Sequence, residues 1–152
     1  MERITSFCVD HDFIKTGIYV SRIDGDITTY DLRTRRPNCD DYMDHSTMHT
    51  LEHLFATYIR NSDIGDSVIY FGPMGCQTGF YLLVRGLDNE TVLKEVKATL
   101  KKIISHEGRV FGDTRKECGN YRSLDLGSAK AEAIRYLNAL ESREQTFVYP
   151  TE

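Results

Sequence analysis

The residues His49-Thr50-Leu51-Glu52-His53 combine two imidazoles and a carboxylate at a spacing that allows metal chemistry. In a helix, His49 and His53 lie one turn apart on the same side, with Glu52 beside them. Two such imidazoles can share one metal ion, and the carboxylate can move protons for a molecule that the metal binds. A helix with two surface histidines is the alternative, and we favour the metal site. The motif leaves the reaction open.

A catalytic zinc or iron site needs about three protein ligands and one open position. The third ligand must come from elsewhere in the chain, and its candidates are Cys8, His11, Cys39, Cys76, His106 and Cys118. Cys76 and Cys118 have the better context, because each adjoins a glycine in a predicted loop. Composition does not choose among the six, and packing as a small apolar side chain is the usual role of a single cysteine.

The motif needs a helix that holds it against a core. Apolar residues recur at three- and four-residue intervals on the neighbouring face, at Met48, Leu51, Phe55 and Ile59. This spacing predicts a helix over 46–60 with a core side and a chemical side. Ser46 is the expected N-cap.

Four strands and two further helices are predicted around this helix. Alternating residues on either side of a turn at Asp24-Gly25 predict a hairpin of strands 18–23 and 27–33. β-Branched and aromatic runs predict strands 67–71 and 80–84, joined by a glycine-rich loop around Cys76. Apolar stripes predict a helix that Asn89 caps and a last helix over 126–143, with Ile134 among its inward residues.

The order of these elements indicates the fold class. A hairpin, a helix, two strands and two helices predict an α+β fold, an antiparallel sheet packed against helices in an α/β sandwich. A chain of 152 residues is long enough for one domain with a proper core, so we expect a single domain over 1–152.

Composition excludes several classes of partner. The net charge is -4 and there is no long basic run, so nothing points to nucleic acid. No window approaches about eighteen apolar residues and the N-terminus lacks an apolar signal core, so we expect no membrane association and a cytoplasmic protein. The four cysteines are scattered, which in a reducing compartment favours free thiols, metal ligands or catalytic groups.

Motifs along nearly the whole chain resemble those of the S-ribosylhomocysteine lyase (LuxS) family. They are Ser6-Phe7 with Asp10-His11, Asp31-Leu32-Arg33 before Pro37-Asn38, His49-Thr50-Leu51-Glu52-His53, Pro73-Met74-Gly75-Cys76-Gln77-Thr78-Gly79 and Cys118-Gly119. Their order is that of the family, and the run from Pro73 after such a helix is very specific. The resemblance implies an α/β sandwich of the LuxS or inverzincin-like type.

The resemblance also implies a set of catalytic groups. His49, His53 and Cys118 match the metal ligands, with Fe(II) the expected native ion and zinc or cobalt able to substitute. Glu52 and Cys76 match the two acid/base residues. A thiolate forms readily near neutral pH, so Cys76 suits the transfer of carbon-bound protons, and Glu52 that of oxygen-bound protons.

Further positions match the substrate contacts of the family. Ser6, His11 and Arg33 match residues that bind the substrate, and Arg33 suits a polar or anionic part of it. In the family these residues reach across a homodimer interface into the site of the neighbouring subunit. A homodimer with sites at the subunit interface is therefore expected from the resemblance alone.

The activity implied is that of a metal-dependent carbon–sulfur lyase. Family members move the carbonyl of open-chain S-ribosylhomocysteine twice and then eliminate homocysteine by β-elimination. The other product is dihydroxypentanedione, the autoinducer precursor of quorum sensing. A metal supplies Lewis acidity to the migrating oxygens.

The chain departs from the family pattern at three places. Tyr70 stands where many relatives carry an aspartate, and Arg36 replaces a glutamine that is common before Pro37. The segment 112–117 before Cys118 is unlike the usual run. These departures leave the metal and acid/base residues complete and bear on their surroundings.

Two other functions use the same helix. In a small metallopeptidase with the H-x-x-E-H order, Glu52 would activate a metal-bound water, although such enzymes usually take a downstream glutamate as third ligand. A non-catalytic metal-binding or metal-sensing module would need a closed site with four ligands. A ligand set that contains a cysteine and leaves a position open would argue against both.

Overall fold

The computed structural model describes residues 1–152, and its central feature is a four-stranded antiparallel sheet with the order β1-β2-β4-β3. The strands are β1 (Gly17–Asp24), β2 (Ile27–Arg33), β3 (Val68–Pro73) and β4 (Gly79–Arg85). The predicted hairpin is confirmed, but its two loop residues are Gly25 and Asp26, because Asp24 pairs with Ile27. Gly25 has φ +63°, which a glycine adopts without strain.

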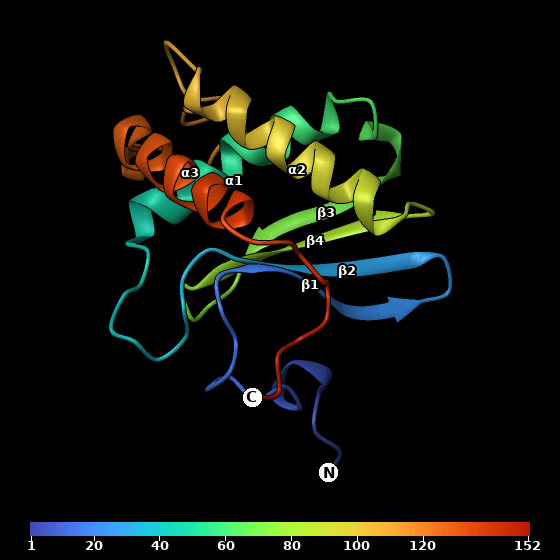
Figure 1. The fold of residues 1–152 in the computed structure, drawn as a ribbon. Coiled ribbons are helices and arrows are strands. Elements are labelled where there is room, and N and C mark those ends of the chain that lie inside the picture. Colours follow the sequence, from blue (N-terminus) through green and yellow to red (C-terminus); the bar gives the residue numbers. More distant parts are fainter.

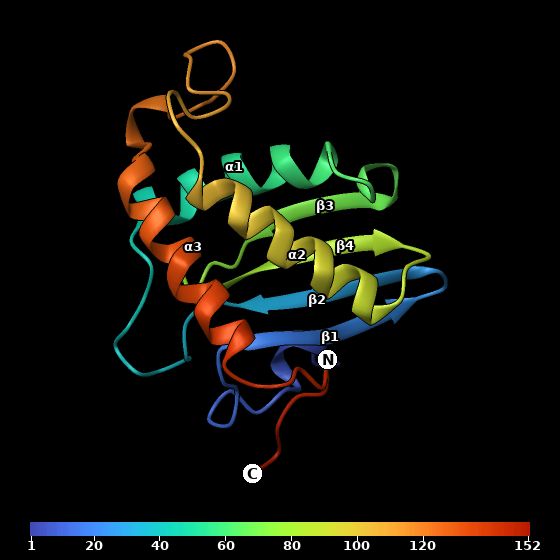
Figure 2. The same ribbon diagram turned by 45° about the horizontal axis from the view of Figure 1, so that its top comes forward.

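Three helices cover one face of this sheet (Figures 1 and 2). They are α1 (His45–Arg60), α2 (Asn89–Ile104) and α3 (Leu126–Glu141). The opposite face carries no helix layer, and the N-terminal segment and the C-terminal tail run below it in Figure 1. This arrangement confirms the expected α+β class with an antiparallel sheet packed against helices.

The helices α1 and α2 begin slightly earlier than predicted. Asp44, not Ser46, caps α1, since its carboxylate accepts from the Thr47 backbone N–H at 2.7 Å. Asp88, not Asn89, caps α2 in the same way. An aspartate at this position also carries a negative charge toward the positive end of the helix dipole, which stabilises the helix start.

The prediction that Ile134 faces inward on the last helix is wrong. Ile134 has 46% of its surface exposed, whereas Tyr136 is buried with 2% exposed. The inward stripe of α3 runs through Ala129, Ala133, Leu137 and Leu140, so Ile134 lies just outside it.

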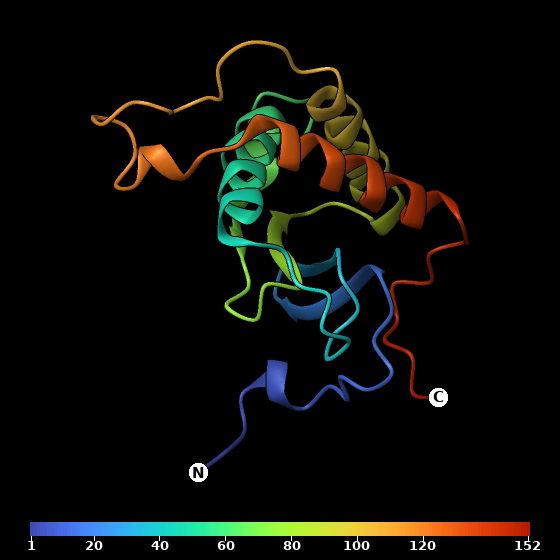
Figure 3. The same ribbon diagram turned by 90° about the vertical axis from the view of Figure 1, so that its left-hand side faces the viewer.

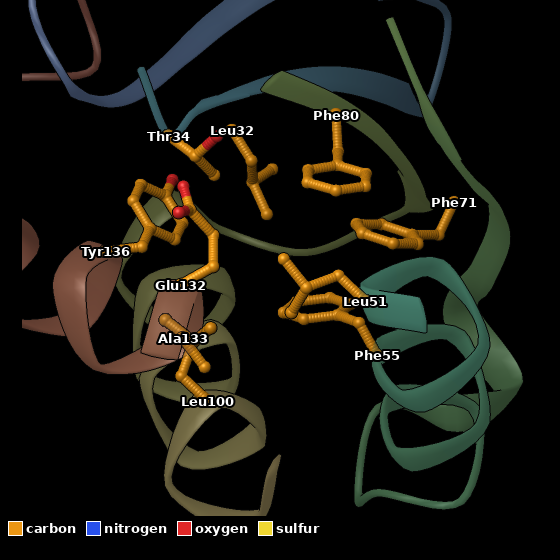
Figure 4. Close-up of a pocket in the computed structure, with 10 residues that line it drawn as sticks. All are labelled: Leu32, Thr34, Leu51, Phe55, Phe71, Phe80, Leu100, Glu132, Ala133 and Tyr136. Atoms are coloured by element: carbon orange, nitrogen blue, oxygen red, sulfur yellow. The ribbon is translucent and has the colours of Figure 1, made fainter. Parts of the chain in front are cut away.

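Apolar side chains of the helices and the sheet form one core, and Figure 4 shows part of it around a small cavity. Phe71 of β3 stacks between Phe55 of α1 and Phe80 of β4, with ring centroids 4.4 and 5.0 Å away. In the cavity beside these rings, the centre of a water molecule can occupy a volume of only about 10 Å³. This is at the lower limit for one water, so the interior of the fold offers no ligand site.

Candidate functional site

The structure brings the two motif histidines together with one cysteine. The ligand atoms of His49, His53 and Cys118 all lie within 4.8 Å of one another, and the three side chains are half-buried. Cys118 Sγ lies 3.3 Å from His49 Nε2. Of the six candidates for a third ligand, the fold therefore places Cys118 beside the histidines. Cys118 lies 65 residues beyond His53 in the chain.

The histidine rings are oriented by partners in the segment between α2 and α3. His53 Nδ1 donates to the Phe111 carbonyl at 2.7 Å, and His49 Nδ1 lies 2.6 Å from Ser123 Oγ. Since a carbonyl only accepts, His53 carries its proton on Nδ1 and leaves the Nε2 lone pair available. Such partners fix the tautomer and orientation of metal-binding histidines.

The local charges favour the ligand forms of these side chains. Burial, followed by the neighbouring His53 and His45, lowers the pKa of His49, which keeps its imidazole neutral at neutral pH. The backbone N–H of Asn120 donates to Cys118 Sγ at 3.4 Å, so this sulfur already acts as an acceptor. Two imidazole nitrogens and one cysteine sulfur are a donor set that fits a divalent transition metal such as zinc or iron.

Glu52 lies on α1 next to this group. Its side chain is half-exposed, and the structure gives it no hydrogen bond or ion pair. Cys118 lines an open hollow of about 400 Å³, together with the cations Arg115 and Arg122. The metal-binding group is therefore accessible from solvent.

A second polar group gathers at the end of β2 and the β3–β4 turn. Arg33 donates from Nε and Nη2 to the two oxygens of Asp31 at 3.0 and 2.6 Å, and its Nη1 donates to Thr78 Oγ1 at 2.8 Å. Cys76 Sγ lies 3.0 Å from Thr78 Oγ1 and 4.0 Å from Arg33 Nη1. Only 3% of Arg33 and 1% of Asp31 are exposed, whereas Cys76 is exposed.

The charges of this group support one another. Burial acts to lower the pKa of Arg33, but the Asp31 carboxylate outweighs burial, so the pKa is raised and the guanidinium stays charged. Burial, with the Asp31 charge, also raises the pKa of Tyr81 on β4. The nearest polar neighbours of Cys76 are the permanently charged Arg33 and the buried hydroxyl of Thr78.

Ser6 and His11 lie in the N-terminal segment. Ser6 and Tyr81 line the same hollow on the face of the sheet that no helix covers. His11 Nδ1 donates to the Val9 carbonyl at 2.9 Å, which leaves its Nε2 as an acceptor. Ser6, Cys76 and Arg33 thus belong to the surroundings of the open sheet face, whereas α1 lies on the other face.

The two groups are separate within one chain. No hydrogen bond in the structure links the His49–His53–Cys118 group to the Cys76–Arg33 group. Figures 1 and 3 show the segment between α2 and α3 at one extremity of the molecule, well away from the β3–β4 turn.

The other cysteines and histidines stay outside both groups. Cys8, Cys39 and His45 are exposed. His106 is buried, with its ring nitrogens 2.6 Å from the Tyr58 hydroxyl and 2.8 Å from the Arg109 carbonyl. It packs against Phe111 and supports the loop that holds His53.

The three departures from the family pattern lie at the surface or in loops. Tyr70 is half-exposed and its hydroxyl covers Gly72 on the open face of the sheet. Arg36 is exposed. The segment 112–117 forms part of the loop that leads to Cys118, and Gly112 lies against the His53 ring.

Several residues of the site carried no role in the sequence analysis. Phe111 and Ser123 lie in a region without periodicity, so nothing in the sequence pointed to them. Asp31 and Arg33 are two residues apart in β2, so strand alternation places them on one face but does not by itself predict that they pair. Thr78 lies in the quoted motif, whereas Tyr149, which contacts Asp31, had no signal at all.

No helix of the structure has both the length and the apolar character needed to cross a membrane.

Comparison with known proteins agrees with the geometry. The family model described as S-ribosylhomocysteinase (LuxS) matches residues 4–147. The proteins named S-ribosylhomocysteine lyase from Clostridium beijerinckii and Phocaeicola vulgatus are each 42% identical to the chain, over 99% of both sequences. That from Borreliella afzelii is 38% identical, over 99% of this chain and the whole of the relative. The chain therefore belongs to the S-ribosylhomocysteinase (LuxS) family.

Proposed function

We propose that the protein is a metal-dependent S-ribosylhomocysteine lyase, which releases homocysteine and dihydroxypentanedione. The observation that carries this proposal is the His49–His53–Cys118 group in a chain that is similar over nearly its full length to proteins named for this activity. Dihydroxypentanedione is an autoinducer precursor, so the product serves quorum sensing. The free cysteines of the chain suit a reducing compartment, and we propose the cytoplasm.

The metal-binding group supplies the electrophile of the reaction. When bound there, a divalent metal supplies Lewis acidity to the carbonyl oxygens of the sugar. We propose Fe(II) as the native ion, one per chain, with zinc or cobalt as substitutes. His53 and His49 present Nε2 because their Nδ1 atoms face Phe111 and Ser123.

Cys76 and Glu52 are the proposed acid/base residues. Each carbonyl migration takes a proton from one carbon and returns it to the neighbouring carbon. A second proton moves from the hydroxyl oxygen that becomes the carbonyl to the carbonyl oxygen that becomes a hydroxyl, so the step needs a base for each kind of proton. The Cys76 thiolate, close to Arg33, would carry these carbon-bound protons. Glu52 is unpaired on α1 and would carry oxygen-bound protons and assist the final loss of homocysteine as a thiol.

Ser6, His11 and Arg33 are the proposed substrate contacts. His11 offers Nε2 as an acceptor for a sugar hydroxyl. Arg33 already donates three hydrogen bonds to Asp31 and Thr78, so the substrate meets only the N–H groups that remain. Its contribution is therefore a fixed charge beside Cys76 more than a mobile grip.

The separation of the two groups supports a site shared between two copies of the chain. The metal-binding group lies beside α1, and the Cys76–Arg33 group lies at the open face of the sheet. We propose a homodimer in which the Cys76–Arg33 group of one copy faces the metal-binding group of the other. In such a dimer, the two-fold axis between the copies relates two equivalent sites, each built from both chains.

The two other functions are less well supported. A metallopeptidase would depend on Glu52 and a metal-bound water alone, which leaves the buried Arg33 and the exposed Cys76 without a role. A metal sensor with a closed site needs four ligands, and the group found here contains three donors.

The test is thiol release from S-ribosylhomocysteine. The protein is purified without oxygen, loaded with Fe(II) or cobalt, and free homocysteine is followed with a thiol reagent. Release that His53→Ala abolishes through loss of metal, and that Cys76→Ala abolishes with the metal still bound, supports the proposal. No release from fully metallated protein contradicts it, and normal turnover by Cys76→Ala rejects the thiol as the base.

A further inference from the structure

The C-terminal tail closes over the buried Asp31–Arg33 pair. Tyr149 donates its hydroxyl to Asp31 Oδ2 at 2.7 Å, and burial together with the Asp31 charge raises the pKa of Tyr149, so it stays a protonated donor. The family model matches residues 4–147, so Tyr149 lies two residues after the end of that match.

The tail is held in place by contacts on either side of this tyrosine. Phe147 is buried, and its carbonyl accepts from the Val20 backbone N–H at 2.9 Å. The Tyr149 ring stacks on Tyr19 of β1, with centroids 4.9 Å apart and planes 19° apart. The position of the Tyr149 hydroxyl over Asp31 is therefore fixed by backbone and ring contacts together.

A continuous chain of hydrogen bonds runs from Tyr149 to the Cys76 sulfur. Asp31 accepts from both Tyr149 and Arg33, and Arg33 also donates to Thr78 Oγ1. Since Thr78 Oγ1 accepts this bond, its own hydrogen is free to point at Cys76 Sγ, 3.0 Å away. Every donor in the chain then favours a sulfur that accepts, which is the thiolate form.

We propose that Tyr149 is a positioning residue that holds the Asp31–Arg33–Thr78 hydrogen bonds in the arrangement that favours the Cys76 thiolate. The Tyr149 hydroxyl takes up part of the Asp31 charge, so Arg33 donates more strongly to Thr78 Oγ1, and Thr78 in turn donates more strongly to the sulfur. Without this bond, Asp31 presents a stronger negative charge and has more freedom to turn away from Arg33. The consequence for turnover rests on the proposed role of Cys76 as the base.

The titratable and charged groups that face this sulfur come from three elements. They are Asp31 and Arg33 of β2, Tyr81 of β4 and, through Asp31, Tyr149 of the tail. The exposed Cys39 belongs to none of these contacts and serves as the internal control, whereas Cys8 lines the same hollow as Tyr149.

The test is the pH profile of alkylation of each cysteine in the full-length, zinc-loaded protein. Iodoacetamide reacts with thiolates, and peptide mass spectrometry reports each cysteine separately. In Tyr149→Phe, which keeps the ring and removes the hydroxyl, the midpoint for Cys76 should rise by about half a pH unit. Alkylation of Cys76 near neutral pH should slow about threefold, while Cys39 keeps its profile.

Tyr19→Phe is the matched control, because it removes a hydroxyl from the same stacked pair. The Tyr19 hydroxyl donates to the Lys15 carbonyl and has no contact with Asp31. Its Cys76 profile should equal that of the wild type. An unchanged profile in Tyr149→Phe, or an equal shift in both variants, overturns the proposal and leaves the tail as a structural anchor.

A second variant tests whether the effect travels through the threonine. Thr78→Val removes the hydroxyl next to the sulfur, and adding Tyr149→Phe to it should produce little further shift. Additive shifts would overturn the proposed route. The alkylation assay needs no substrate, so a shifted profile in a protein without lyase activity would reject the proposed function and keep this inference.

Discussion

The position of His53 depends on the small residue beside its ring. Gly112 has φ +70°, and a Cβ at this position would lie 3.2 Å from His53 Nδ1, the atom that donates to Phe111. Gly112→Ala should therefore displace the ring and weaken zinc or cobalt binding about tenfold, as loss of an orienting partner typically does. Competition with a chelator of known affinity measures the change.

Gly108→Ala is the control for this prediction. Gly108 lies in the same loop with φ +85°, and a Cβ there would meet nothing within 4 Å. Both substitutions strain the backbone, but only Gly112→Ala contacts His53. Equal losses of metal affinity in the two variants would show that loop strain, and not the ring contact, is responsible.

At this scale, the sequence predicted which side chains come together better than it predicted their surroundings. The spacing of His49 and His53 indicated a shared metal on elementary helix geometry, and the resemblance selected Cys118. The partners Phe111 and Ser123 lie in a loop whose path depends on packing against Tyr58 and α1, and no local pattern encodes that path.

The first turn of α1 positions the metal-binding histidines, and Asp44 holds that turn. Asp44→Ala should lower the free energy of unfolding by about 1 kcal/mol, measured by urea denaturation at neutral pH. The bond from Thr47 lowers the pKa of Asp44. The stabilisation is therefore present above the ordinary aspartate pKa and is lost as the pH falls through the lowered value.

Asp44→Asn separates the hydrogen bond from the charge. Asparagine also caps helices well, so this variant should unfold with nearly the wild-type free energy at neutral pH. Its cap does not titrate, so its stability should fall less than that of the wild type toward acid pH. A parallel decline of the two proteins would show that other carboxylates cause the acid loss.

The two glycines on either side of Cys76 in the β3–β4 turn differ in how closely other atoms approach them. A Cβ on Gly79 would lie 2.6 Å from the Leu32 carbonyl of β2, whereas one on Gly75 would meet nothing within 4 Å. Gly79→Ala should separate β4 from β2 and cost about 2 kcal/mol or more of unfolding free energy, as overpacking does. Thermal unfolding of the two variants measures the difference. Gly75→Ala should unfold like the wild type, and equal destabilisation of Gly75→Ala and Gly79→Ala would contradict the argument.

The elements themselves were largely predictable because their periodicities are strong. The strand alternation gave the hairpin, and the apolar stripes gave the three helices. The caps of α1 and α2 differ from the predicted ones by one or two residues. At each of these helix starts, two residues that can cap a helix stand close together, Asp44 with Ser46 and Asp88 with Asn89. Only the backbone conformation decides which of the two is the cap.

The two faces of the sheet have different tasks in the whole molecule. The helix-covered face holds the core, and α1 carries the metal-binding histidines on its outer side. The open face carries Asp31 and Arg33, which Tyr149 of the tail and Thr78 of the β3–β4 turn contact. Periodicity predicted the strand that carries this pair, but not its near-complete burial, because the tail and the turn that contact it have no repeating pattern.

A site shared between copies has a consequence that mixed dimers can test. His53→Ala damages the metal-binding half and Cys76→Ala the other half, so neither homodimer should release homocysteine. After unfolding and refolding an equal mixture, half of the dimers contain both chains, and each has one intact site, so about a quarter of wild-type activity should return. The thiol-release assay measures this recovery.

Two variants of the same half provide the control for the mixed dimers. A mixture of His53→Ala with Cys118→Ser damages only the metal-binding group, so every shared site in it lacks an intact ligand set. It should therefore stay inactive whichever chains pair. If the His53→Ala and Cys76→Ala mixture also stays inactive while its dimers form, each site lies within one chain. The open face of the sheet would then need another explanation for its buried charges, because no second copy would be using them.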